Sequence, residues 1–291
     1  MTVQLGGVGL WAPLGLWIQE GARLPEAAAE VDALGFGAIW LGNGPTIMDV
    51  ASSLLDAAPR ITVATGIVNI WQHPVEEVAA RHAQLTARHP ARLLLGLGNG
   101  PREPSQWLLS PYRMMVEYLD QLDASGCSAG DRVLGAVGPR MTALAAARSL
   151  GAHPFLTTVE HTRQARAALG VGPLLAPELK VVLEADPGRA RSIARQALDF
   201  YLSKRGYSAN LRRLGFTEED LTGRGSDRLV DAVVAWGDMA TVVGRVREHH
   251  QAGADHVAIQ VLSEDTDQPR PDRRRLPREQ YRRLAEALCG V

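Results

Sequence analysis

Short apolar runs, rich in β-branched residues, alternate with longer segments of helical periodicity along almost the whole chain. This alternation is typical of βαβ units that form a parallel sheet. Two of the expected helices begin at a proline, Pro74 and Pro187, where the missing N–H costs nothing. Because eight runs alternate with helices, the pattern favours an α/β fold of the (β/α)8 TIM-barrel class over an open sheet. The expected strands are 7–10, 38–41, 61–65, 93–96, 133–137, 153–157, 180–183 and 257–261.

A long excursion at about residues 203–238 breaks the alternation between the last two expected strands. Its polar, glycine-containing stretch 217–226 predicts an insertion with partial helix. No low-complexity linker and no short internal repeat divides the chain. We therefore expect one domain over residues 1–291.

The overall charge argues against two classes of binding protein. Lys and Arg number 31 and Asp and Glu 32, which gives a net charge of −1. A nucleic-acid or anionic-membrane binder normally needs a large cationic surface. One basic cluster lies near the C-terminus, and it fits either a solvated helix face or contact with an anionic cofactor tail. Its members are Arg270, Arg273, Arg274, Arg275, Arg278, Arg282 and Arg283.

The cysteines and the apolar segments indicate the compartment. Cys127 and Cys289 are the two cysteines, and they have no metal-binding or redox spacing. The first residues lack the charge and apolar core of a signal peptide, and no apolar run approaches the ~20 residues that span a bilayer. A soluble, cytoplasmic protein is expected.

The segments that follow the expected strands are rich in Gly, Asn and Pro. In a TIM barrel the active site lies at the carboxyl ends of the strands. Glycines let backbone approach a ligand closely, and amides at a helix start favour phosphate. The pattern predicts a pocket for a large, flat, phosphorylated ligand. The segments are 42–45 (GNGP), 66–74 (GIVNIWQHP), 96–101 (GLGNGP), 138–140 (GPR) and 157–162 (TTVEHT).

Common catalytic motifs are missing from the sequence. There is no H-E-x-x-H, C-x-x-C, G-x-S-x-G or P-loop pattern, and the run at 96–100 fails the G-x-G-x-x-G register. Few carboxylates follow the expected strands, which weakens a metal-assisted hydrolase or a two-carboxylate glycosidase, and no metal site is expected. A bound cofactor is then the natural carrier of the chemistry.

Several of these segments resemble a known family, the luciferase-like monooxygenase superfamily. Within it they are similar to the actinobacterial branch of deazaflavin (coenzyme F420)-dependent oxidoreductases. The resemblance covers nearly the whole chain and keeps the order of its elements. The segments that carry it are 61–74 (ITVATGIVNIWQHP), 92–100 (RLLLGLGNG), 135–155 (GAVGPRMTALAAARSLGAHPF), 35–42 (GFGAIWLG), 225–231 (GSDRLVD) and 252–257 (AGADHV).

The resemblance implies a set of cofactor contacts. A non-prolyl cis peptide bond at Gly66–Ile67 would back the central ring, and the same loop contributes Asn69. The remaining contacts are Gly98, Asn99 and Gly100 at the pyrimidine end, and Gly138, Pro139, Thr157, Thr158 and His161 along the side chain and phosphate. The cofactor would be F420, with FMN as the alternative.

The substrate side follows less of the family pattern. Trp11 and Trp71 are expected to wall a small organic substrate. Related sugar-phosphate dehydrogenases place a His after strand two and a carboxylate in the strand-four loop, where this chain has Asn43 or Gly44 and Pro101. Proton-transfer roles are therefore not inherited, and the candidate catalytic residues are His73 and Asn43, with Glu103 next.

Three functions stay open at this point. The first is hydride transfer between deazaflavin C5 and a small organic substrate. The second is an FMN-dependent monooxygenase that uses reduced flavin and oxygen, and the third is a ligand-binding relative without catalysis. Family precedent implies a homodimer.

Overall fold

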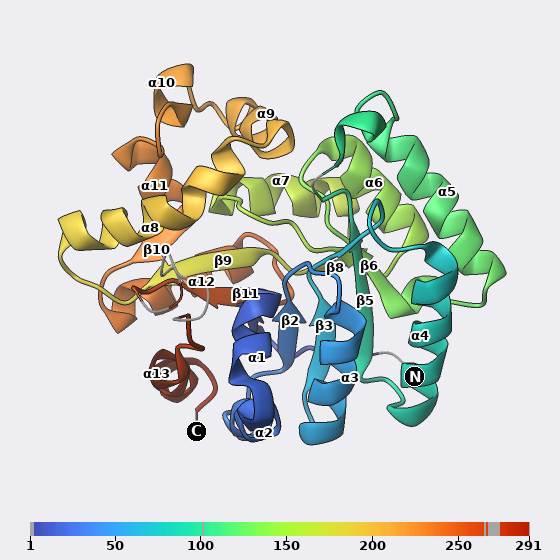
Figure 1. The fold of residues 1–291 in the computed structure, drawn as a ribbon. Helices are drawn as coiled ribbons and strands as arrows, with labels where there is room; N and C mark the ends of the chain where they lie inside the picture. Colours follow the sequence, from blue (N-terminus) through green and yellow to red (C-terminus); the bar gives the residue numbers. More distant parts are fainter. Residues whose placement is uncertain (1–2, 101, 265, 267–273, 291) are drawn as a thin grey trace.

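The computed structural model describes residues 3–100, 102–264, 266 and 274–290. Its strands form one curled, parallel sheet surrounded by helices (Figure 1). Hydrogen-bonded neighbours follow the order β10-β9-β11-β1-β2-β3-β5-β6-β7-β8, with β4 paired to β5. The strands are β1 Val8–Ala12, β2 Ala38–Leu41, β3 Thr62–Thr65, β4 Val68–Asn69, β5 Leu93–Gly98, β6 Arg132–Leu134, β7 Gly151–Ala152, β8 Leu174–Leu175, β9 Glu178–Val182, β10 Val234–Trp236 and β11 Val257–Val261.

One extended segment joins β8, at one end of this order, to β9, which lies next to the other end. Strands β8 and β9 follow each other along the chain, and β8 pairs with β7 while β9 pairs with β11. Between them, the Glu178 amide donates to the Pro154 carbonyl at 2.9 Å, and the Ala258 amide donates to the Pro177 carbonyl at 2.9 Å. The pairings therefore curl back toward their start, and the fold is TIM-barrel-like, as the sequence pattern predicts.

Helices follow most strands and cover the outside of the sheet (Figure 1). Asp186 caps α8 by accepting the Arg189 amide at 2.8 Å, in front of Pro187 at the first helical position, as expected from the sequence. The helices are α1 Leu14–Glu20, α2 Leu24–Ala33, α3 Ile47–Ala57, α4 Val75–Arg88, α5 Pro111–Ala124, α6 Pro139–Arg148, α7 Val159–Leu169, α8 Pro187–Leu202, α9 Arg205–Arg213, α10 Glu218–Leu221, α11 Asp227–Val233, α12 Met239–Gln251 and α13 Arg278–Leu288, with single 3-10 turns at Gly21–Arg23, Pro104–Gln106 and Ala129–Asp131.

Two expected strands differ from the structure. The run at 153–157 is not regular strand: β7 is Gly151–Ala152, because Pro154 has no N–H to donate to a ladder. The seventh strand begins earlier than residue 180, with β8 at Leu174 and β9 at Glu178.

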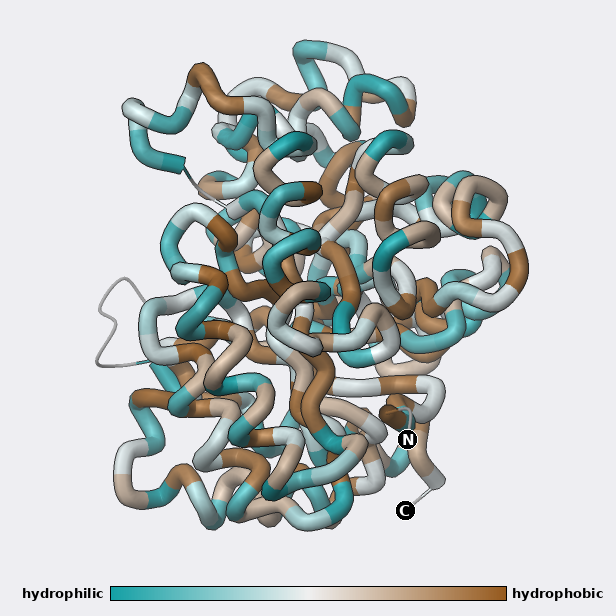
Figure 2. The backbone as a smooth tube through the Cα atoms, turned by 90° about the vertical axis from the view of Figure 1, so that its right-hand side faces the viewer, coloured by the Kyte–Doolittle hydropathy of each residue, from teal (hydrophilic) through white to brown (hydrophobic). Residues whose placement is uncertain are grey.

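Alternate residues of each strand face two separate cores. Trp40 and Ala258 belong to a cluster inside the curled sheet, whereas their neighbours Ile39 and Ile259 belong to the cluster between the sheet and the helices. Hydrophobic segments run through the middle of the molecule and hydrophilic turns gather at its periphery (Figure 2). The strands are buried on both faces, which explains their continuous apolar character.

The excursion at 203–238 is folded. It contains α9, α10 and α11 and ends in β10, which joins the sheet beside β9. The sequence pattern missed β10 because its three residues, Val234–Trp236, are too few to show a periodicity. Helices α9 and α10 stand above the sheet, at the top of Figure 1.

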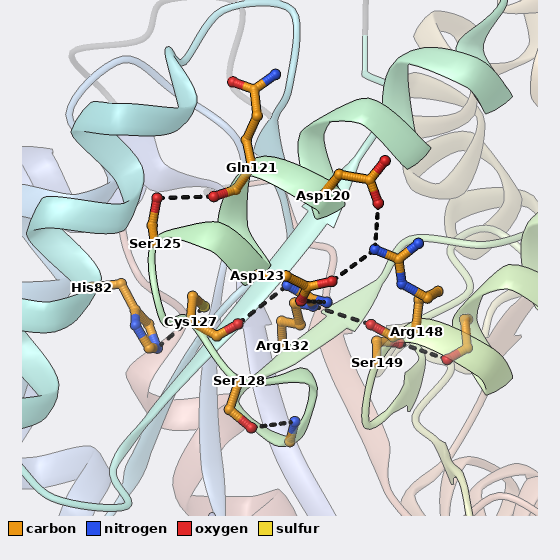
Figure 3. A network of polar contacts seen from close by, with 12 residues as sticks. His82, Asp120, Gln121, Asp123, Ser125, Cys127, Ser128, Arg132, Arg148 and Ser149 are labelled. Atoms are coloured by element: carbon orange, nitrogen blue, oxygen red, sulfur yellow. Dashed lines mark hydrogen bonds and ion pairs between the residues drawn. The ribbon is translucent and has the colours of Figure 1, made fainter.

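A polar network holds β6, and with it the loop that leads to Gly138, in place (Figure 3). The buried Arg132 guanidinium contacts Asp123 of α5 at 2.5 Å and donates to the carbonyl oxygens of Cys127 at 3.2 Å and Arg148 at 3.0 Å. Arg148 of α6 in turn pairs with Asp120 and Asp123, each at 2.7 Å. Because these donors and acceptors come from α5, the loop after it, β6 and α6, the network fixes these elements relative to one another.

The basic cluster near the C-terminus contacts other helices. Arg278 of α13 reaches the buried carboxylate of Glu20 at 2.6 Å and Glu30 at 3.2 Å, and Arg282 also pairs with Glu30. These two arginines therefore support a helix–helix role rather than a cofactor contact; Arg270 and Arg273 lie outside the described residues. Within the part of the chain that is described, no helix has both the length and the apolarity to cross a bilayer.

Candidate active site

The loop after β3 forms the centre of the candidate site. The Gly66–Ile67 peptide bond is cis, as the family resemblance implies. The Trp11 indole N–H donates to the Gly66 carbonyl at 3.1 Å from the neighbouring β1. A Cβ on residue 66 would lie 2.7 Å from Trp11 Nε1 and 3.0 Å from His153 Nε2, so this position fits glycine alone without a shift of buried rings.

The loops after β3, β5 and β6 lie against one another. A Cβ on Gly98 would lie 2.7 Å from Ile67 Cγ1, and a Cβ on Gly135 would lie 3.2 Å from Ile67 Cγ2. A Cβ on Gly100 would lie 2.8 Å from Nδ2 of the buried Asn69. The structure therefore brings together the residues predicted to contact the centre and pyrimidine end of a ring.

His73 and Asn43 come from the adjacent loops after β4 and β2. His73 hydrogen-bonds the backbone of Gly44, and its own carbonyl accepts from the Tyr118 hydroxyl at 3.1 Å. Burial lowers the pKa of His73, against the opposing effects of the Gly44 bond and Glu77. Asn43 is exposed and donates to Gln72 Oε1 at 3.1 Å. Of the two residues, His73 is the more shielded from solvent.

The Trp71 side chain lies under the loop that leads into α5. The guanidinium of Arg102 stands 5.5 Å from the Trp71 ring centroid, and Gln106 Nε2 approaches the Trp71 carbonyl at 3.5 Å. Glu103 is exposed and takes part in a capping box with Gln106 at the 3-10 turn that begins at Pro104. Pro101 lies outside the described residues.

The remaining predicted contacts surround the amino ends of α6 and α7. Gly138 is the N-cap of α6, and Thr158 caps α7 by accepting the His161 amide at 3.1 Å. His161 Nε2 lies 3.0 Å from the Val137 carbonyl, which joins this loop to the one after β6. Glu160 is turned to solvent, where it pairs with Arg163 and accepts from Gln164 at 3.0 Å. Its charge therefore does not oppose a phosphate at these helix ends.

Two charged residues inside the sheet were missed by the sequence prediction. Lys180 and Glu178 of β9 have side chains 0% and 1% exposed, and they pair at 2.9 Å. The Lys180 ammonium lies 3.8 Å from the Phe155 ring centroid, and Phe155 packs on Trp11 at 5.0 Å. Desolvation raises the pKa of Glu178, and Lys180 opposes this rise. Their spacing of two places both on the same face of β9, but Glu178 lies outside the expected strand 180–183, so the sequence pattern did not reveal the pair.

His153 and Trp40 fill the interior below Gly66. The two rings stack at 4.0 Å, and the Trp40 indole donates to His256 Nε2 at 3.0 Å. Burial lowers the pKa values of His153 and His256 to about 4, so both imidazoles are neutral at pH 7. Trp40 is fully buried and is a core residue.

Five of the predicted site residues carry buried polar atoms that have no partner within the described structure. Such an atom costs about 1–3 kcal/mol unless a ligand or water satisfies it. Together with the close-packed glycines 66, 98 and 100, these atoms fit a flat ring with polar edges and a phosphorylated tail. The atoms are Trp71 Nε1, His73 Nε2, Asn99 Oδ1, Thr157 Oγ1 and His161 Nδ1.

Two surface cavities lie elsewhere. One, of about 480 Å³, is lined by residues of β10 and α12 such as Trp236 and Thr241. The other, of about 370 Å³, lies at the opposite end of the strands, beside Gly7 and His250. None of the predicted site residues lines either one.

Comparisons with known proteins bear on the family and on the fold. Residues 8–125 match the family model described as luciferase-like monooxygenase, which confirms the predicted superfamily resemblance over this part of the chain. No match was found among curated proteins.

Solved structures share the fold at low sequence identity. The coenzyme F420-dependent tetrahydromethanopterin reductase from Methanopyrus kandleri is 14% identical, with a TM-score of 0.73 over 98% of this chain and 99% of that one. An F420-dependent secondary alcohol dehydrogenase in complex with an F420–acetone adduct is 14% identical, with a TM-score of 0.68 over 88% and 93% of the chains. The oxygenating constituent of 3,6-diketocamphane monooxygenase from the CAM plasmid of Pseudomonas putida, in complex with FMN, is 12% identical, with a TM-score of 0.59 over 89% and 92%.

Proposed function

We propose that this luciferase-like chain is a single (β/α)8 barrel that uses coenzyme F420 to transfer a hydride to or from a small organic substrate. The observation that carries the proposal is the set of unpartnered polar atoms and tightly packed glycines around Gly66–Ile67. The fold of two F420-dependent enzymes supports the choice of cofactor. Residues 203–238 are proposed as an insertion that covers part of the barrel mouth.

In this proposal, each loop of the site holds a different part of the cofactor. The Gly66–Ile67 loop backs the central ring, and the segment Gly98, Asn99 and Gly100 contacts the pyrimidine end. Thr157, Thr158, His161, Gly138 and Pro139 hold the side chain and its phosphate. When bound, the deazaflavin supplies a carbon that donates or accepts a hydride. The protein contributes orientation and the exclusion of water, and Trp11 and Trp71 wall the substrate.

His73 is the proposed proton carrier. Its Nε2 has no partner among the described residues, and its lowered pKa keeps the imidazole neutral at pH 7. A neutral imidazole accepts a proton from a substrate hydroxyl as the adjacent carbon loses its hydride, and returns that proton in the reverse direction. Asn43, on the neighbouring loop, orients the polar end of the substrate.

A second candidate function is an FMN-dependent monooxygenase. The description of the matched family and the fold of an FMN-bound oxygenase favour it. The third possibility, a ligand-binding relative without catalysis, rests on the family His that is missing at Asn43 or Gly44 and the family carboxylate that is missing at Pro101.

An anaerobic redox assay tests the proposal. The protein is incubated with oxidised F420 and a panel of secondary alcohols, or with reduced F420 and the matching carbonyl compounds, while the deazaflavin absorbance is followed. Turnover in the absence of oxygen that becomes much slower in His73→Gln supports the F420 function. Turnover of reduced FMN that depends on oxygen supports the second candidate, and tight binding without any turnover supports the third.

A further inference from the structure

Helix α9 of the excursion brings a cation to the amino ends of α6 and α7. A Cβ on Gly138 would lie 3.4 Å from Arg213 Nη2, and the same nitrogen donates to Asn210 Oδ1 at 3.0 Å. Arg213 is also close enough to His161 to lower the pKa of that imidazole, beside the larger effect of burial. Helix α9 lies above α7 at the top of Figure 1.

Arg213 differs from its neighbours in having no carboxylate partner. The adjacent Arg212 forms a two-pronged ion pair with Glu218, at 2.5 and 2.9 Å. Within the described chain, no carboxylate lies at ion-pair distance from Arg213, and Glu160, the acidic residue in the first turn of α7, points to solvent. A guanidinium left without an internal anion is available to an external one.

Helix α9 and the segment that begins α7 also carry buried polar atoms. Asn210 Nδ2, His161 Nδ1 and Thr157 Oγ1 are all unpartnered in the described structure, on residues that are 3%, 5% and 1% exposed. The amino end of α6 adds to them, because Gly138 supplies no capping side chain. A phosphate ester accepts hydrogen bonds from groups of this kind: side-chain amides, hydroxyls, a guanidinium and the free amides at a helix start. His161 Nδ1 joins these donors when a bound anion favours protonation of the imidazole ring.

We propose that Arg213 and Asn210 of α9, with His161, Thr157 and the amino end of α6, form an anion subsite for the phosphate ester of the cofactor. The proposal rests on the proposed function for the identity of that cofactor. It gives the excursion a binding role, since α9 supplies both the cation and a buried amide to loops that follow β6 and β7.

The test compares ligands with and without the phosphate. Ring fluorescence is followed while the protein is titrated with FMN and riboflavin, and with F420 and its phosphate-free deazaflavin chromophore. The wild-type protein should bind the phosphorylated member of a pair more tightly. Arg213→Gln should weaken that member about 10- to 100-fold and leave the phosphate-free member unchanged. Arg213→Lys should restore part of the difference, because it keeps the charge but not the two-pronged geometry.

Arg212→Gln is the matched control, since it removes a neighbouring charge of the same helix that pairs with Glu218. It should bind every ligand as the wild type does. Equal weakening of both members of a pair by Arg213→Gln, or no preference for phosphate in the wild type, overturns the subsite. Circular dichroism of each variant verifies the fold.

A second measurement separates this proposal from the proposed function. If neither ring binds, the cofactor assignment fails, and the subsite is then tested with inorganic phosphate alone. Phosphate should raise the melting temperature of the wild type and of Arg212→Gln but not of Arg213→Gln. An equal rise in all three proteins, or none, contradicts the subsite itself.

Discussion

The buried ion pair of β9 gives the sharpest stability prediction. Lys180→Met keeps a side chain of similar length against the Phe155 and Tyr201 rings, which lie 3.8 and 4.9 Å from the ammonium. It removes the cation that stands 2.9 Å from Glu178 Oε1. The second carboxylate oxygen then keeps only its hydrogen bond from the Leu156 amide, at 3.2 Å.

The size of the effect follows from burial. Both side chains are essentially inaccessible to water, so a carboxylate left alone has neither solvent nor a cation to stabilise its charge. Breaking one side of such a pair costs about 3–5 kcal/mol, a large part of the ~5–15 kcal/mol by which domains are stable. Glu178→Gln added to Lys180→Met removes the stranded charge and should recover about half of the loss or more.

Urea unfolding of the wild type and the two variants at pH 7 measures these differences. The pH dependence gives a further check, because loss of Lys180 removes the main influence that opposes the raised pKa of Glu178. A carboxyl whose folded-state pKa is raised stabilises the fold below its unfolded pKa of about 4.3 and loses that stabilisation as pH rises through the folded value. The deficit of Lys180→Met should therefore shrink toward pH 4. A loss below about 1 kcal/mol, or a double variant no more stable than the single one, refutes the reasoning.

The remaining predictions concern the backbone at Gly66 and the stability of the protein in acid. Gly66→Val should abolish cofactor binding and destabilise the fold by about 1–3 kcal/mol, because its Cβ would meet Trp11 and His153. Ligand titration measures the loss of binding and urea unfolding measures the loss of stability. Unchanged binding would contradict the placement of the site. Burial lowers the pKa values of His153 and His256 to about 4 and of His249 to about 3, so the unfolded state binds more protons as pH falls below about 6.5. Stability should fall between pH 6.5 and 5 by up to about 1.4 kcal/mol per pH unit for each histidine, and a flat profile over this range would show that the rings are not held neutral.

The order and type of the elements were predictable because apolar periodicity carries them. The expected strand 257–261 coincides with β11, and the helix from Pro187 to about residue 202 coincides with α8. The errors lie where periodicity fails: β10 has three residues, and β8 and β9 begin among Pro and polar residues that resemble a turn.

Part of the site was also predictable from the sequence and part of it was not. The cluster around Gly66 and Gly98 was predictable because it consists of strand-end segments, which a barrel gathers at one end. Its cis peptide bond was implied by the family resemblance, and no spacing rule gives it. Arg213 and the Glu178–Lys180 pair could not be placed from the sequence, because their roles depend on tertiary contacts with segments far along the chain.

The most direct test of the central claim is an equilibrium titration of the purified protein with F420 and, separately, with FMN, followed by ring fluorescence. We expect micromolar or tighter binding of F420, weaker binding of FMN, and loss of binding in Gly66→Val. Preferential binding of FMN would move the protein to the oxygen-using function. Binding of neither cofactor, or equal binding by Gly66→Val, would contradict the placement of the active site around Gly66–Ile67.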